Sequence, residues 1–190
     1  GEERIKTKCK DLVVMNEEKG FSVSSSAFEA EHFDEVIFTG SAKGILKTFP
    51  FLQNKGLEAI SQIRYTAVAE VAVGFEKWEG FPLDGFGALI PSKEKRRILG
   101  ILFMSSLFQN RAPKGGAMLS VFVGGERHPE YVSLSDDELK ALVKEELIPI
   151  LKIPNFNPAI FEISRHQEAI PQYDLLTPDR INAFKAAEEN

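Results

Sequence analysis

The segment from Tyr65 to Phe75 constrains the fold most strongly. Apolar side chains alternate along it and occupy both of its faces. One face carries Ala67, Ala69, Val71 and Val73, and the other carries Val68 and Ala72. A strand that is apolar on both sides is covered on both sides. The segment therefore predicts a central strand of a sheet.

More strands are expected on either side of this segment. Residues 4–26 alternate as a hairpin or meander does, and the apolar run at 33–39 ends at Gly40, which is typical of a buried strand leading into a loop. The remaining strand candidates are residues 86–90, 98–103, 117–123 and 158–168. Short helices are expected after the cap residue Ser41, in residues 54–62, and from Thr177-Pro178 onward.

Residues 136–148 form the clearest helix candidate. Ser135 and Glu138 have the spacing of a capping box. An apolar stripe follows at helical spacing, made of Leu139, Leu142, Val143 and Leu147. Pro149 should end or kink this helix. Strands grouped around one long helix predict an α+β fold, with a mixed, mostly antiparallel sheet and flanking helices.

The composition is that of a globular protein with a sizeable core. The chain has 190 residues, 43% of them hydrophobic, which is enough for one compact domain or one domain with part of another. A net charge of −5 argues against a dedicated nucleic-acid-binding domain, which is usually basic. Cys9 is the single cysteine, and the sequence shows no signal-peptide pattern and no apolar run long enough to span a membrane. A reducing, cytoplasmic location is expected.

Two short stretches resemble binding motifs. Gly85-x-Gly87 matches the start of a dinucleotide-binding loop, but the third glycine is missing and a strand follows instead of a helix. A glycine inside a strand more often permits a bulge or a close approach to the backbone. The basic residues of 93–97 lie between two strand candidates, so they are interpreted as a charged hairpin tip, with contact to an anionic lipid or an acidic substrate as the alternative.

No self-contained catalytic or metal-binding constellation is visible. The three histidines are far apart, Cys9 stands alone, and Asp136-Asp137 is explained by its place in the first turn of a helix. A Cys9–histidine pair stays open, although nothing local favours it. The aromatic candidates for a binding surface, each equally consistent with the core, are Trp78, Phe86, Phe108 and Tyr173.

Several segments together resemble the oxygen-dependent protoporphyrinogen oxidases, in the flavin amine-oxidase superfamily. The most specific are GFGALIPSKEKRRILGILFMSSLFQNRAPKGG followed by LSVFVGG, and HQEAIPQYDL; FDEVIFTGSAKGIL and LSDDELKALVKEEL match in the same order. The resemblance covers nearly the whole chain. Members of this family are much longer and carry a G-x-G-x-x-G flavin fingerprint that this sequence lacks.

The resemblance therefore implies an internal fragment. Residues 1–58 would be a partial excursion of the flavin domain, 59–165 the substrate-binding domain, and 166–190 the return towards the flavin domain. FAD would belong to the full-length parent and would not be bound by this fragment, which alone is expected to be inactive. A homodimer, and peripheral contact with the inner face of the membrane, are left open.

The resemblance also assigns a substrate pocket. Phe86, Gly87 and Leu89 would line the porphyrinogen site, with the missing Cβ of Gly87 letting a flat macrocycle approach, and Ile170 would line another part of it. It implies no catalytic residue here, and it places the arginine that pairs with a substrate propionate outside this chain. The parent would oxidise protoporphyrinogen IX to protoporphyrin IX in haem biosynthesis. The alternatives are coproporphyrinogen III oxidation to coproporphyrin III, a non-redox tetrapyrrole-binding module, and a flavin amine oxidase with another substrate.

Overall fold

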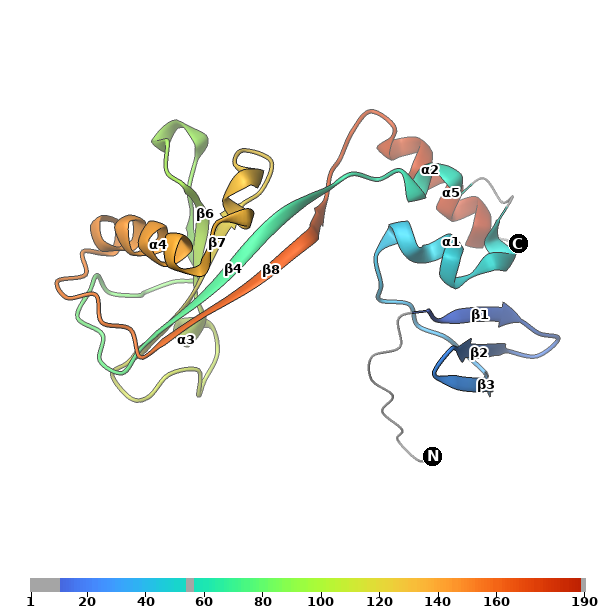
Figure 1. The fold of residues 1–190 in the computed structure, drawn as a ribbon, viewed down its shortest axis with the longest axis horizontal. Coiled ribbons are helices and arrows are strands. Elements are labelled where there is room, and N and C mark those ends of the chain that lie inside the picture. Colours follow the sequence, from blue (N-terminus) through green and yellow to red (C-terminus); the bar gives the residue numbers. More distant parts are fainter. Residues whose placement is uncertain (1–10, 54–56, 189–190) are drawn as a thin grey trace. The chain divides into compact units, whose positions relative to one another are not determined.

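The computed structural model describes residues 11–53 and 57–188 (Figure 1). The chain forms two compact units, residues 1–64 with 172–190, and residues 65–171. Among the described residues, no helix has the length and apolar character that crossing a membrane requires.

The unit of residues 65–171 is built on a five-stranded sheet in the order β5-β6-β7-β4-β8, with every pairing antiparallel. The strands are β4 (Tyr65–Phe75), β5 (Gly87–Leu89), β6 (Ile98–Phe103), β7 (Ala117–Gly124) and β8 (Ile160–Pro171). Strand β4 pairs with β7 along one edge and with β8 along the other, so it is a central strand, as the sequence predicts. The predicted α+β class with a mostly antiparallel sheet is confirmed.

Helix α4 (Asp136–Leu151) covers one face of this sheet (Figure 1). Ser135 and Glu138 form the predicted capping box, and the hydroxyl of Ser135 accepts from the backbone N–H of Glu138. The stripe from Leu139 to Leu147 packs on the odd-numbered residues of β4 and β7. Those buried residues include Val71, Val73, Leu119 and Val121.

Of the two effects expected of Pro149, an end or a kink of the helix, the end is not observed. The helix continues to Leu151, and Lys152 then adopts a left-handed conformation at its C-cap. Proline removes one donor near the end of the helix, where few bonds remain to be lost. Ile153 N–H donates to Ile148 O, and Leu151 is 2% exposed, so burial and a backbone bond hold the last turn.

Short helical segments occupy the connections of the same unit. They are the 3₁₀ segments η3 (Ser92–Glu94) and η4 (Pro129–Ser133), and the four-residue helix α3 (Met104–Leu107). α3 falls between the strand candidates of residues 98–103 and 117–123. The hydroxyl of Ser105 accepts from Met118 N–H, which ties α3 to the start of β7.

The other unit begins with a three-stranded antiparallel meander of β1 (Val13–Asn16), β2 (Phe21–Ser25) and β3 (Phe28–Phe33), as the alternation of the sequence predicts. Residues 4–10 of that prediction, with Cys9, lie outside the described residues. The helical segments are η1 (Ala42–Gly44), α1 (Ile45–Thr48), η2 (Pro50–Leu52), α2 (Glu58–Ser61) and α5 (Thr177–Glu188). The hydroxyl of Ser41 accepts from Lys43 N–H, so the predicted cap is present.

The strand expected at 33–39 is not formed. The chain leaves the meander at Phe33, and the residues that follow make no ladder. Phe38 instead packs its ring edge-on against Phe49, with 5.3 Å between the ring centroids. The apolar character of this run therefore serves an aromatic cluster of the unit rather than a sheet.

A buried arginine joins the two chain segments of this unit. Arg180 of α5 is 6% exposed; its Nε donates to Ala59 O at 3.0 Å, and its Nη1 lies 2.7 Å from Asp174 Oδ1. The same carboxylate oxygen accepts from Leu176 N–H. The hydrogen bond from Arg180 lowers the pKa of Asp174 below its usual value.

This pair predicts an acid-sensitive contribution to the stability of its unit. A carboxyl group whose pKa is depressed by folding stabilises the fold above its unfolded pKa, and this contribution is lost as the pH falls through the folded value. Thermal unfolding measured between about pH 6 and about pH 2 should show a smaller loss of stability in Asp174→Asn than in the wild type. Asp34→Asn, at an exposed carboxylate of the same unit, is the matched control. Equal pH profiles for Asp174→Asn and the wild type would contradict the assignment.

Candidate functional site

The second face of the five-stranded sheet carries the alternate residues of each strand, because successive side chains point to opposite sides. Strand register aligns them in three rows. The first holds Leu89, Gly100, Phe122, Glu70 and Ser164; the second holds Gly87, Leu102, Ser120, Ala72 and Glu162; the third holds Met118, Gly74 and Ile160. We call the surface made by these three rows the open face.

The open face carries several exposed apolar side chains. Leu89 is 89% exposed, Ile160 is 47% exposed and Leu102 is 37% exposed. The side chain of Leu89 rests over Gly100, since a Cβ at Gly100 would meet Leu89 Cδ2 at 3.3 Å. Exposed apolar side chains gathered on one surface mark a site of interaction.

One polar pair lies in the middle of the open face. Ser120 on β7 donates its hydroxyl to Glu70 Oε1 on β4 at 2.9 Å, and Ser120 is 5% exposed. The buried hydroxyl of Ser120 therefore has a hydrogen-bond partner. The pair places the carboxylate of Glu70 among apolar neighbours.

The structure brings three of the four predicted site residues together. Gly87 and Leu89 lie on the open face, and Phe86 extends the same ladder, because Phe103 N–H donates to Phe86 O at 2.9 Å. Phe86 is 78% exposed. Ile170 lies apart from them: it pairs with Thr66 at the end of β8, four strands away from β5, or about 19 Å across the sheet. The pocket roles of all four residues stay predictions.

Gly87 has a different physical role from the one that the resemblance suggests. Its φ is +148°, and a Cβ there would overlap the carbonyl oxygen of Ile101 and lie 2.9 Å from Leu102 Cα. The space beside Gly87 is therefore filled by the backbone of β6. The missing Cβ lets the two strands pair closely, rather than making room for a ligand.

Leu102 and Phe122 also lie on the open face, but they are not among the site residues predicted from the sequence. The alternation within 98–103 and 117–123 is visible in the sequence, but the sequence does not say which of the two alternating sets faces the helix. Only the pairing of β6 with β5 and β7 puts Leu102 and Phe122 beside Leu89 and Gly87.

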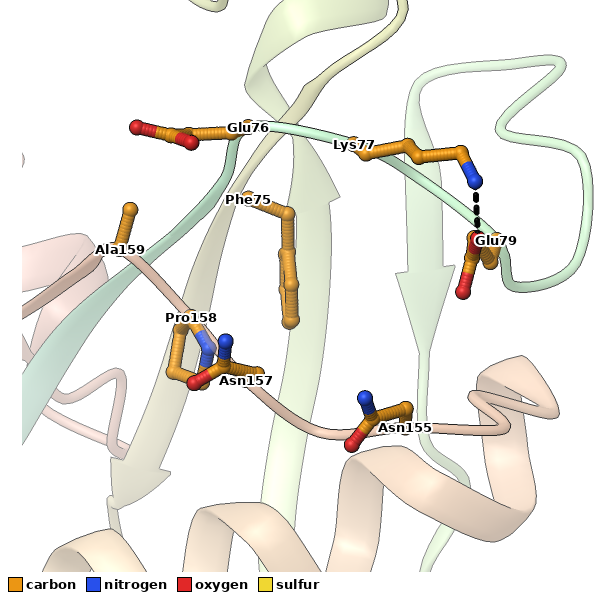
Figure 2. A pocket seen from close by; sticks show the side chains of 8 residues that line it. All are labelled: Phe75, Glu76, Lys77, Glu79, Asn155, Asn157, Pro158 and Ala159. Atoms are coloured by element: carbon orange, nitrogen blue, oxygen red, sulfur yellow. Dashed lines mark hydrogen bonds and ion pairs between the residues drawn. The ribbon is translucent and has the colours of Figure 1, made fainter.

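Two hollows lie at the end of the open face. One, of about 360 Å³, is lined by Gly74, Met118 and Ile160 of the third row together with Phe75, Glu76, Arg111, Ala112, Pro113, Ala117 and Ala159. The other, of about 370 Å³, is more polar and shares Phe75, Glu76 and Ala159 with the first. Figure 2 shows this second hollow, where Lys77 pairs with Glu79 and the amides of Asn155 and Asn157 lie on the opposite wall.

The basic cluster of residues 93–97 has partners within the chain. Arg97 Nε donates to Glu146 Oε1 at 3.1 Å and its Nη2 donates to Glu145 Oε2 at 2.6 Å, while Arg96 Nη1 lies 3.6 Å from Glu146 Oε2. The bond to Glu145 leads the interactions that raise the pKa of Arg97. Half of the cluster thus fastens the β5–β6 connection to α4.

The aromatic candidates divide between core and surface. Trp78 packs edge-on against Phe75 at 5.2 Å, and its Nε1 donates to Phe81 O. Phe108 is 53% exposed and Tyr173 is 87% exposed. Within the part of the chain that the structure describes, no group of three or more histidine, cysteine, aspartate or glutamate side chains is arranged to hold a metal ion.

The Gly85-x-Gly87 turn does not have the form of a dinucleotide-binding loop. A pyrophosphate is held by a glycine-rich turn that opens a helix. Gly85-x-Gly87 instead runs into β5, where Gly87 pairs with Leu102 of β6. The arrangement can bind a flat apolar molecule on the open face, with polar groups at its centre and its end.

Comparison with known proteins places the chain in a family. The model of the flavin-containing amine oxidoreductases matches residues 2–179. A mitochondrial protoporphyrinogen oxidase of Nicotiana tabacum is 37% identical over 172 residues, which are 85% of this chain and 33% of that protein. A coproporphyrinogen III oxidase of Bacillus subtilis (strain 168) is 27% identical over 158 residues, covering 81% of this chain and 32% of that protein.

The fold has a counterpart among solved structures. A crystal structure of a candidate protoporphyrinogen oxidase from Exiguobacterium sp. 255-15 aligns with a TM-score of 0.67 at 22% identity, covering 94% of this chain and 38% of that one. The chain spans about a third of the length of the curated relatives it matches. The resemblance inferred from the sequence motifs is confirmed: this chain belongs to the flavin-containing amine oxidoreductase family.

Proposed function

We propose that this chain works as part of a longer FAD-dependent oxidase that converts protoporphyrinogen IX to protoporphyrin IX in haem biosynthesis, and that the open face supplies part of the porphyrinogen pocket. The exposed apolar side chains gathered on the open face are the observation that carries the proposal. This face lies on a chain that aligns over 85% of its length with a protoporphyrinogen oxidase. In this proposal the substrate-binding domain is residues 59–165, and residues 1–58 and 166–190 belong to the flavin domain.

The open face suits a flat, largely apolar ring. Leu89 and Leu102 offer apolar surface that a bound macrocycle would remove from water, next to Phe122 on the neighbouring strand. In this proposal the FAD of the oxidase is held by parts of the polypeptide outside this chain, and the Gly85-x-Gly87 turn, which leads into β5 instead of a helix, supports that placement. The role of this chain is then to bind and orient the porphyrinogen.

Oxidation of coproporphyrinogen III to coproporphyrin III is the second candidate, and the match to the coproporphyrinogen III oxidase of Bacillus subtilis favours it. The two substrates share the macrocycle and differ in their side arms, since coproporphyrinogen III carries more carboxylates. The open face accommodates the ring of either. A non-redox tetrapyrrole-binding module would use the same surface without turnover.

The test compares this chain with a longer polypeptide that includes the flavin-binding parts. The longer protein should purify with bound flavin and oxidise a porphyrinogen, and its relative rates with the two porphyrinogens and with a simple amine should separate the candidates. This chain alone should bind a porphyrin, should show no flavin absorbance and should not turn over. If the longer protein oxidised the amine and neither porphyrinogen, the proposal would be overturned. Stoichiometric flavin bound to this chain alone would contradict the proposed place of the FAD site.

Substitutions on the open face test the pocket itself. Leu89→Ala should weaken porphyrin binding by about 10-fold, because apolar area that the ligand covers is lost, and Phe86→Ala should weaken it as well. Leu175→Ala is the matched control, since Leu175 is 97% exposed in the other unit. Quenching of Trp78, the single tryptophan, reports the affinity. An affinity that neither substitution lowers beyond the Leu175→Ala control would remove the assignment.

A further inference from the structure

The hollow of about 360 Å³ at the third row of the open face has one cationic side chain in its wall. Met118, Gly74 and Ile160 form its apolar floor, and Arg111 comes from the connection between α3 and β7. Gly74 lets this floor close, because a Cβ there would lie 3.1 Å from Ile160 Cβ and 3.3 Å from the sulfur of Met118. We call this hollow, with the lining given above, the Arg111 groove.

Arg111 is placed to receive an anion. Its Cζ lies 5.7 Å from the centre of the Phe108 ring, a cation–π arrangement that holds the guanidinium while leaving its donors available. Among the described residues Arg111 has no carboxylate within ion-pair distance. A guanidinium presents a planar fork of donors that matches the two oxygens of a carboxylate.

The Arg111 groove adjoins the surface on which a macrocycle would lie. Its floor is the third row of the open face, about 6.7 Å along the strands from the second row, which holds Leu102 and Ser120. A ring covering the first two rows would therefore direct a flexible side arm into the groove. The groove offers apolar walls for the methylene groups of such an arm and a cation for its end.

We propose that the Arg111 groove is the subsite for one carboxylate-bearing side arm of the tetrapyrrole, with Met118 and Ile160 against the methylenes and Arg111 on the carboxylate. This inference rests on the proposed function. It assigns a propionate-pairing arginine to this chain, in addition to the one that the family resemblance places elsewhere. Arg111 would thereby set the orientation of the ring on the open face.

Glu76 opposes the incoming carboxylate. It lies in the wall of the same groove, on the open-face side of β4 by alternation with Gly74. Figure 2 shows its carboxylate pointing away from Asn155 and Asn157, the far wall of the neighbouring hollow. Removing the charge of Glu76 should therefore change affinity in the direction opposite to removing that of Arg111.

The experiment titrates the chain with protoporphyrin IX and with its dimethyl ester, following Trp78 quenching. Arg111→Gln should weaken binding of the free acid by about 3- to 10-fold and leave the ester unchanged, because only the acid pairs with the guanidinium. Glu76→Gln should tighten binding of the acid by about twofold or more. Lys114→Gln, which removes the same charge from an exposed position of the same loop, should leave both affinities within about twofold.

Two failures are distinguishable. A wild-type chain that binds neither porphyrin would refute the proposed function, and the subsite with it. A wild-type chain that binds the acid and the ester equally, or an Arg111→Gln variant with an unchanged acid-to-ester ratio, would refute the subsite while leaving the open face as the macrocycle site. Equal effects of Arg111→Gln and Lys114→Gln would show long-range attraction only, which also refutes the subsite.

Discussion

Replacing Arg97 by alanine is expected to lower the free energy of unfolding of the Tyr65–Pro171 unit by about 3 kcal/mol. Glu146 on α4 is 5% exposed and accepts from Arg97 Nε through Oε1, while its Oε2 has no hydrogen-bond partner among the described residues. Removing Arg97 leaves a buried carboxylate whose one remaining counter-charge, within the described parts of the chain, is Arg96 at 3.6 Å. That residual partner is why the expected loss is near the lower end of the range for a broken buried pair.

Two further variants separate this effect from a surface ion pair. Glu145 also accepts from Arg97, but its side chain is 64% exposed, so Glu145→Ala should cost less than about 1 kcal/mol. Replacing the pair together, as Arg97→Met with Glu146→Leu, should recover most of the stability, because no charge remains buried. Urea unfolding curves give the values. Equal losses for Arg97→Ala and Glu145→Ala would contradict the buried-charge explanation.

Gly87→Ala is expected to destabilise the β5–β6 pairing by about 2–3 kcal/mol. Alanine at this position meets both an unfavourable positive φ and the backbone of Ile101 and Leu102. Gly85→Ala is the matched control, because Gly85 has a similar φ of +142° with nothing within 4 Å of its Cβ position. It should therefore cost about 1 kcal/mol, the backbone strain alone.

Hydrogen exchange and thermal unfolding measure the two glycine variants. Gly87→Ala should lose protection of the amides that β5 and β6 share, such as Ile90 N–H, which donates to Leu99 O. Gly85→Ala should keep that protection. If the two variants are equally stable, close pairing with β6 is not the reason why position 87 requires glycine. Because hydrogen exchange and thermal unfolding are measured without a ligand, these two measurements report the strand pairing and not ligand binding.

The sequence predicts correctly those elements that have both a clear hydrophobic period and a clear signal at their ends. β4 is found because its apolar residues fill both faces, and α4 because a capping box begins its apolar stripe. The failures have local causes. The run at 33–39 is as apolar as a strand, yet its residues serve ring packing between Phe38 and Phe49. Pro149 lies so near the end of α4 that its missing donor changes little.

The candidate site is harder to obtain from sequence because strand order decides it. Leu89 and Leu102 become neighbours only through the β5–β6 register, and Ile170 is separated from both by the order of the five strands. Alternation divides each strand into two sets of residues without saying which set the helix covers. Arg111 gives no signal of its own in the sequence, since the groove that it lines needs residues from β4, β7 and β8.

The adjacent ends of β4 and β8 bear on how the unit of residues 65–171 can be replaced during evolution or engineering. Tyr65 and Pro171, the first and last residues of their unit, are paired neighbours, and Gln172 N–H donates to Arg64 O directly beyond them. The chain enters and leaves this unit at adjacent points, as in an inserted domain. We therefore expect residues 65–171 to be exchangeable as a unit, because its two junctions with the rest of the chain are adjacent. A new ligand surface can be grafted there without rerouting the rest of the polypeptide.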